Sequence, residues 1–287
     1  MVFCVLASLD IIAQENSQKQ FLPKEGDWAI GVDVLPVINF IGNSFNGTID
    51  QKIEGLAGAP ITKGSNLFDN ALMPDASIMF KYMLRDQIAL KANVGMQFSN
   101  DWNRQYVQDD KAIALDPMSE EKLIDSKLTK TTGMSLSIGA EYRKGARRVQ
   151  GIFGLSALAA FQNQTTSYNF GNGITSVNQR PSTAFPEAYT NDGYRIIKNG
   201  NTTSDAFIGL AGSVGLEWFV APQIAIGSEV NLSFYYLFGK QKYTESEKFE
   251  TSLEQVVNHT DITSPGNRGF YCGTETLGGS LYMIFYF

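Results

Sequence analysis

Ile224 to Phe238 form the sequence IAIGSEVNLSFYYLF, in which apolar and polar residues alternate. One parity holds Ile224, Ile226, Val230, Leu232, Phe234 and Tyr236, and the other holds Ala225, Gly227, Glu229, Asn231 and Ser233. Successive side chains of a β-strand point to opposite faces, so a period of two predicts a strand with one apolar face. We therefore expect a strand whose two faces lie in different surroundings.

Seven further segments show the same alternation and are also predicted to be strands. They are Trp28–Ile41, Ala76–Leu84, Gln87–Ser99, Thr132–Tyr142, Val149–Gln162, Ala206–Val220 and Thr276–Phe287. The composition agrees, because a chain with 18% charged and 12% aromatic residues is too apolar and too aromatic to be disordered. Eight alternating segments predict an all-β protein.

The connections between these segments are alternately short and long. Three are hairpin-length, at Arg85-Asp86, Arg143 to Arg148 and Ala221 to Gln223. Four are long and polar, at Gly42–Asp75, Asn100–Thr131, Asn163–Asp205 and Gly239–Glu275. Short turns on one side and long loops on the other are typical of outer-membrane barrels. The sequence thus predicts a closed antiparallel eight-stranded transmembrane β-barrel with long extracellular loops, short periplasmic turns and both termini in the periplasm.

Aromatic residues on the apolar parity support a membrane location. The periplasmic strand ends carry Trp28, Tyr82, Tyr142, Trp218, Phe285 and Phe287, and the outer ends carry Phe40, Phe98, Phe161, Phe234, Tyr236 and Phe238. Amphipathic rings are favoured at both membrane interfaces, so these residues are expected to form two belts. The alternative is a soluble eight-stranded barrel of the lipocalin kind, whose apolar face would point inward.

The polar parity predicts the contents of the barrel interior. An eight-stranded barrel is just wide enough for its side chains to fill it, and enclosed charges have to be paired. We expect Glu141, Glu217 and Glu229 to face Lys81, Lys91 and Arg85. The predicted polar network of the lumen comprises Asp33, Lys81, Lys91, Glu141, Glu217 and Glu229. We favour a structural polar core over an ion or proton path, and we do not expect a continuous open pore.

The first residues predict a secretory signal. Residues 1–14 hold an apolar run that ends where the polar stretch from Gln14 begins, which suits a signal cleaved near Ala13 or Gln14. No Lys or Arg precedes the run, so we expect the true start of the signal to lie upstream. Residues 15–25 are expected to be a short periplasmic segment and residues 26–287 the barrel. The alternative is a buried first strand or helix of a soluble protein.

Charge and rare residue types exclude several functions. A net charge of −6 and a pI near 4.9 argue against nucleic acid as a partner. One His and two Cys exclude a disulfide framework and a zinc site built from Cys and His. Carboxylates at Asp109-Asp110, Glu120-Glu121 and Asp125 could bind Ca²⁺ through oxygens, but the spacing of a calcium loop is missing. We expect no metal site, no cofactor and no catalytic residue.

The C-terminus carries a resemblance to a family. The chain ends Leu281-Tyr-Met-Ile-Phe-Tyr-Phe287, in which Leu281, Met283, Phe285 and Phe287 resemble the β-signal of outer-membrane barrels. Together with the Ala13-Gln14-Glu15 junction and the strand pattern, this resembles small outer-membrane barrels of the OmpA/OmpX type, and most closely the Bacteroidota outer membrane protein beta-barrel families. The resemblance implies the outer membrane of a Gram-negative bacterium. It also implies contact with outer-membrane lipid and lipopolysaccharide, and with the barrel assembly machinery during insertion.

Three functions follow as expectations, in decreasing order of support. The first is a non-enzymatic outer-membrane protein whose surface loops serve binding or structural roles, alone or as an accessory subunit of a larger secretion or assembly complex. Such a role would involve other outer-membrane or periplasmic proteins, and the loop aromatics suited to contact are Tyr106, Tyr168, Phe170, Tyr189, Tyr194 and Phe249. The second is a narrow porin-like channel for small solutes. The third is a lipid A-modifying barrel enzyme with His259 as its base.

Overall fold

The fold is that of a computed structural model, which describes residues 21–33 and 77–287. These residues form ten strands, one short α-helix and one 3-10 turn. The strands are β1 Trp28–Asp33, β2 Ser77–Arg85, β3 Ile88–Gln108, β4 Lys122–Ala146, β5 Val149–Asn169, β6 Arg195–Ala221, β7 Ile224–Gly239, β8 Lys242–Glu250, β9 Gln255–Ser264 and β10 Arg268–Tyr286. Helix α2 is Asp110–Leu115, and the 3-10 turn η3 is Pro186–Ala188. Within the described ranges, no helix has the length and hydrophobicity that crossing a membrane would take.

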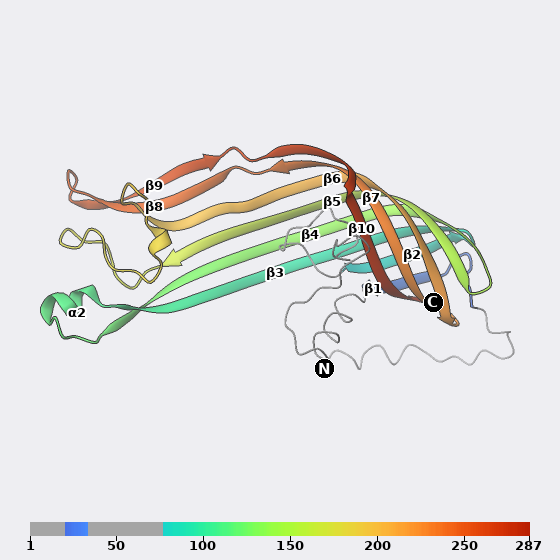
Figure 1. Cartoon of the computed structure of the whole chain (residues 1–287), viewed down its shortest axis with the longest axis horizontal. Coiled ribbons are helices and arrows are strands. Elements are labelled where there is room, and N and C mark those ends of the chain that lie inside the picture. Colours follow the sequence, from blue (N-terminus) through green and yellow to red (C-terminus); the bar gives the residue numbers. More distant parts are fainter. Residues whose placement is uncertain (1–20, 34–76) are drawn as a thin grey trace.

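Eight of the strands form a ring of antiparallel pairings. Each of β1 to β6 pairs with the next strand along the chain, β7 pairs with β10, and β10 pairs with β1. Two-residue turns at Asp86-Gln87, Arg147-Arg148 and Pro222-Gln223 join the hairpins at one end (Figure 1). The predicted all-β antiparallel fold is confirmed. The predicted signal, the first long loop and the second half of the first strand lie outside the described residues.

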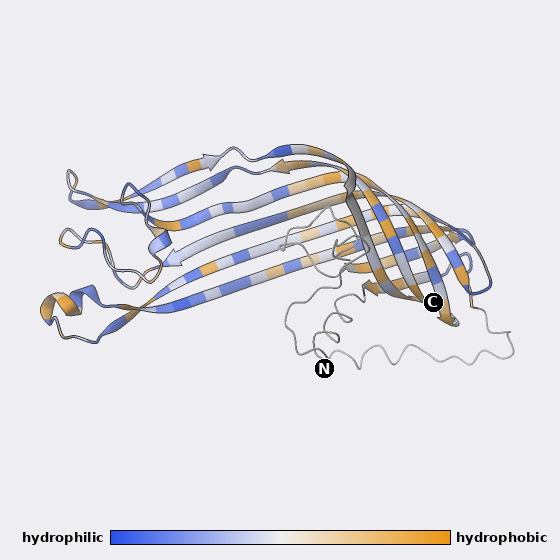
Figure 2. Ribbon diagram, viewed as in Figure 1, coloured by the Kyte–Doolittle hydropathy of each residue, from blue (hydrophilic) through white to orange (hydrophobic). Residues whose placement is uncertain are grey.

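The ring has its polar side chains inside and its apolar side chains outside. On β7, Glu229, Asn231 and Ser233 are 8% exposed or less, whereas Val230, Phe234 and Tyr236 are at least 40% exposed. Alternating hydropathy is visible along the ring strands in Figure 2. A water-soluble barrel would show the reverse arrangement, because apolar burial drives its folding. The predicted orientation of the apolar parity is therefore confirmed, and the inward-facing alternative is wrong.

Apolar side chains fill the interior at the end with the short turns. The buried cluster consists of Ala29, Met79, Met83, Ala89, Ile152, Phe219, Ala225, Tyr282, Ile284 and Tyr286. Phe21 and Leu22 pack against this cluster, and the Arg148 guanidinium lies 4.0 Å from the centre of the Phe21 ring. The backbone N–H of Gly26 donates to the carbonyl of Met83 at 2.9 Å. The segment before β1 is thereby held against this end of the ring.

Beyond the ring, the strands continue into a long polar sheet. β3, β4, β5 and β6 extend past the apolar region, and the β8–β9 hairpin adds to β6 through the pairing of Arg195 with Glu247 (Figures 1 and 2). The prediction that residues 100–131 and 239–275 are loops is therefore wrong for most of their length. Both faces of the extension are largely polar, so the alternation that marks a half-apolar strand fades although backbone pairing continues.

The far end of this extension is ordered by buried polar groups. Asp125 of β4 is fully buried and accepts hydrogen bonds from the backbone of Gly171 at 2.8 Å and of Ala184 at 2.9 Å. Arg195 of β6 donates to the carbonyl of Asn172 at 2.7 Å and forms an ion pair with Glu247 at 2.7 Å. The connection 170–194 is thus fixed to two strands. Of the predicted third loop, Asn163–Asp205, this connection is the part that lies outside β5 and β6.

We predict that Gly227→Ala destabilises the ring. A Cβ at Gly227 would lie 2.2 Å from Cζ of Tyr282, whose ring packs directly over this glycine. Such overpacking typically costs about 1–3 kcal/mol, and displacement of Tyr282 would also remove its hydrogen bond to Glu217. The urea midpoint of the protein refolded in detergent should fall. Gly212→Ala is the matched control, since a Cβ there meets nothing within 4 Å; equal loss in both variants would contradict the packing argument.

Candidate functional site

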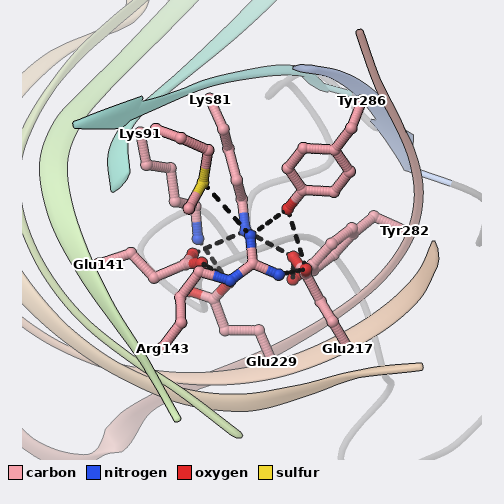
Figure 3. A network of polar contacts seen from close by, with 9 residues as sticks. Lys81, Lys91, Glu141, Arg143, Glu217, Glu229, Tyr282 and Tyr286 are labelled. Carbon is pink, nitrogen blue, oxygen red and sulfur yellow. Dashed lines mark hydrogen bonds and ion pairs between the residues drawn. The ribbon is translucent and has the colours of Figure 1, made fainter. Parts of the chain in front are cut away.

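A cluster of charged residues crosses the interior of the ring above the apolar end. Lys81 comes from β2, Glu141 and Arg143 from β4, and Glu217 from β6, and all four are at most 2% exposed (Figure 3). The alternation of each strand explains their position, because all four stand on the inward parity. Residues from three strands around the ring thus meet at its centre.

Glycines beside the charged residues make room for this cluster. Gly227 lies in register between Glu217 and Tyr282 on the neighbouring strands, and Gly154 is paired with Glu141. The interior of an eight-stranded barrel is only wide enough for its own side chains. Alternation of large charged residues with glycine along each row therefore lets the long side chains reach the centre.

Glu217 accepts more contacts than any other carboxylate that the structure describes in the ring. Its Oε1 accepts from Lys81 Nζ at 2.6 Å and from the Tyr282 hydroxyl at 3.0 Å. Its Oε2 accepts from the Tyr286 hydroxyl at 2.9 Å and from the Arg143 guanidinium. The two cations and two hydroxyls together satisfy both oxygens of a fully buried carboxylate, which would otherwise be costly to remove from water.

The remaining charges complete the pairing. Lys81 Nζ also contacts Glu141 Oε2 at 2.7 Å, and Arg143 donates to the Tyr286 hydroxyl. A second pair joins Lys91 of β3 to Glu229 of β7. Three cations therefore stand with three carboxylates, and the cluster is neutral as a whole. Lys81 and Lys91 are direct neighbours in the β2–β3 register, and their repulsion is offset because each has its own carboxylate partner.

The structure brings together five of the six residues predicted for the polar network. They are Lys81, Lys91, Glu141, Glu217 and Glu229. The side chain of the sixth, Asp33, lies outside what the structure describes. Arg85 does not join the cluster, because it stands at the end of β2 and is exposed.

Sequence reasoning missed Arg143 and two tyrosines. The sequence predicts that Arg143 begins a hairpin-length connection, but β4 continues to Ala146 and puts this side chain inside the ring, where it is 2% exposed. The sequence pattern could have predicted this position, because Arg143 lies two residues after Glu141 and therefore points to the same face of the strand. Tyr282 and Tyr286 stand on the inward face of the last strand, whereas the β-signal pattern concerns its outward face, with Leu281, Met283, Phe285 and Phe287. Phe287 stacks on Trp28 with ring centroids 4.7 Å apart, outside the ring.

The other candidate sites show local structural contacts. Nε2 of His259, on β9, lies 2.8 Å from Asp261 Oδ1, and both side chains are at least half exposed. Asp109 caps helix α2 by accepting from the backbone N–H of Lys111 at 2.8 Å, and Asp110 accepts from the backbone of Ser182 at 2.8 Å. In the part of the chain that the structure describes, no group of His, Cys, Asp and Glu is arranged to hold a metal ion.

Two of the aromatic residues predicted to contact a partner also pack within the protein. The rings of Tyr168 and Phe170 stack on one another at 5.9 Å, and Phe185 packs edge-on against Tyr168 at 5.9 Å. The Arg195 guanidinium lies 4.3 Å from the centre of the Phe170 ring. Tyr106 on β3, by contrast, is 72% exposed and remains available for a partner.

Comparison with known proteins gives remote structural similarities. The crystal structure of the outer membrane protein OprG from Pseudomonas aeruginosa aligns over 93% of this chain and 99% of its own, with 13% identity and a TM-score of 0.33. The E. coli outer membrane protein W aligns over 93% and 100%, with 8% identity and a TM-score of 0.29. No protein-family model and no curated protein matches the chain. The OmpA/OmpX type and the Bacteroidota origin therefore stay predictions.

We predict that Glu217→Gln lowers stability far more than loss of an exposed carboxylate. The amide would remove the ion pair of Arg143 with Glu217 and leave Arg143 only the longer 3.9 Å contact with Glu141. Removal of one partner from a buried ion pair typically costs about 3–5 kcal/mol. Urea unfolding of the refolded protein, followed by gel mobility, measures the loss. Glu245→Gln is the control, since the Lys198–Glu245 pair is one-third exposed and such pairs are worth about 1 kcal/mol or less. Similar midpoints for the two variants would show that the cluster contributes little.

Proposed function

We propose that this protein is an integral outer-membrane β-barrel, closed around its eight-stranded ring and non-enzymatic, whose polar extension serves as a surface for binding or assembly. The observation that carries the proposal is the outward apolar face of the ring. Leu90, Leu136, Leu155, Leu210 and Leu216 are each at least 44% exposed, although leucine is among the residues most often buried. A contiguous apolar surface around a ring calls for an apolar solvent.

Backbone pairing supports the same setting. Bilayer hydrocarbon offers no hydrogen-bonding partner, so only structures whose backbone groups are all paired internally can cross it. The pairing of β10 with both β7 and β1 supports such a closed arrangement. Each described ring strand has a partner on both sides over at least part of its length.

The height of the apolar face also suits a membrane. On β4 the outward side chains from Met134 to Tyr142 are flanked by Lys130 on one side and Lys144 on the other. A strand rises about 3.3 Å per residue, so the fourteen-residue interval between these lysines measures roughly 46 Å along the strand, or about 33 Å when tilted near 45°. This length suits a hydrocarbon layer about 30 Å thick with one ammonium group on each side.

The filled interior favours a binding or structural role over a channel. Lys81, Arg143 and Glu217 meet at the centre of the ring, and the apolar cluster with Tyr282 and Ile284 closes the end below them. Ions or solutes would have to break buried ion pairs to pass. The polar extension, in contrast, offers a large surface on ordered strands, which suits contact with the cell exterior or with a subunit of a larger outer-membrane complex.

We predict that the reconstituted protein carries little or no stable current. Planar bilayers with the full chain inserted, compared with an open porin under the same voltage, measure this directly. Insertion is verified independently by heat-modifiable gel migration and by fractionation with the outer membrane after expression in a Gram-negative host. Stable ohmic channels from correctly inserted protein would favour the narrow porin-like alternative, and recovery in the soluble fraction would overturn the membrane assignment.

A further inference from the structure

The outward face of the polar extension carries a cationic and aromatic surface directly above the apolar face. On β3 this surface contains Trp102, Arg104 and Tyr106, and on β4 it contains Leu128 and Lys130. Trp102 is 59% and Tyr106 72% exposed, and Arg104 and Lys130 are also exposed. We refer to these five residues as the β3–β4 surface.

The register fixes the order of these side chains. Asn100 is paired with Lys130, Trp102 with Leu128, and Arg104 with Ser126, so an aromatic and apolar row separates the two cations. Phe98, paired with Thr132, ends the apolar face one row below Lys130. The β3–β4 surface is therefore continuous with the face that we place in hydrocarbon, and it begins at the depth of the headgroups.

The charge of this face is uniformly positive. From the Phe98 row to the Tyr106 row, the outward positions of β3, β4 and β5 are all described, and they hold no Asp or Glu. Arg104 and Lys130 form no ion pair with any other residue that the structure describes. Lys127, on the opposite face of β4, differs in this respect, because its Nζ lies 3.1 Å from Glu187. Among the described residues, the two outward cations therefore have no carboxylate partner.

The two cations, with the aromatic side chain of Trp102 between them, are spaced as a phosphorylated sugar would require. Arg104 and Lys130 stand four residues apart along the strand direction, or roughly 13 Å. A disaccharide with a phosphate at each end presents anion, apolar ring face and anion in a comparable length. Indole and phenol rings offer an apolar face with a polar edge, which favours them at a headgroup.

We propose that the β3–β4 surface binds the phosphorylated glycolipid headgroup of lipopolysaccharide in the outer leaflet. Arg104 and Lys130 would contact the phosphates, and Trp102 would lie against the sugar between them. This inference rests on the proposed function, since it requires the ring to lie in an outer membrane with the extension on the outer side. The lipopolysaccharide headgroup would then be one ligand of the extension.

The experiment uses the full chain folded in a neutral detergent, titrated with bisphosphorylated lipid A. The same lipid A after removal of its phosphates, and phosphatidylglycerol in the same detergent, form the comparison arms. Binding is measured by native mass spectrometry and by intrinsic tryptophan fluorescence. We expect the double variant Arg104→Gln, Lys130→Gln to bind bisphosphorylated lipid A roughly thirty-fold more weakly, from the usual contribution of two cations near anionic lipid.

Lys144→Gln is the matched control, because Lys144 stands on the same strand and face as Lys130 but at the other end of the apolar face. Its affinity for lipid A should equal that of the unmodified chain. Equal affinity of the double variant and the control would overturn the inference, as would equal binding of phosphatidylglycerol or of dephosphorylated lipid A. Because insertion of each variant is checked separately by gel migration and fractionation, failure of lipid A binding is distinguishable from failure of the membrane assignment.

Discussion

The ring depends on how charge is accommodated at its centre. A narrow ring with its apolar residues outside has to enclose polar ones, and each enclosed charge needs a partner. Glu217 meets this constraint with Lys81, Arg143 and two tyrosine hydroxyls. Because these groups come from β2, β4, β6 and β10, one carboxylate ties together strands from around the whole ring, including the last strand, whose pairing with β1 completes it.

The same arrangement divides the molecule into three zones with different roles. Apolar packing with Phe21 and Leu22 closes the end with the short turns, the charged cluster fills the middle, and the strands then continue into a polar sheet (Figures 1 and 3). The filled centre favours stability over transport. The binding surface that we propose lies on the extension, where Asp125 and Arg195 hold the connection between β5 and β6 in place.

Alternation made the ring strands and most of the charged cluster predictable from the sequence. The signal is strong there because one face meets an apolar medium and the other a polar interior, as at Glu229 beside Val230. Beyond the ring both faces are largely polar, so residues 100–108 and the β8–β9 hairpin show no such pattern, and the sequence predicts loops there. Arg143 was missed for a related reason, since a basic residue near a hairpin suggests a solvated turn unless its parity is followed to the end of the strand.

The central claim is that the outward face of the ring lies in hydrocarbon, and quenching of tryptophan fluorescence by lipids brominated in their acyl chains tests it most directly. One variant would hold a single tryptophan at Leu136→Trp, in the middle of the apolar face of β4, and another only the native Trp102 on the extension. We predict strong quenching of the first and little of the second in the reconstituted protein. An unquenched tryptophan at position 136, in protein shown to be folded, would contradict it.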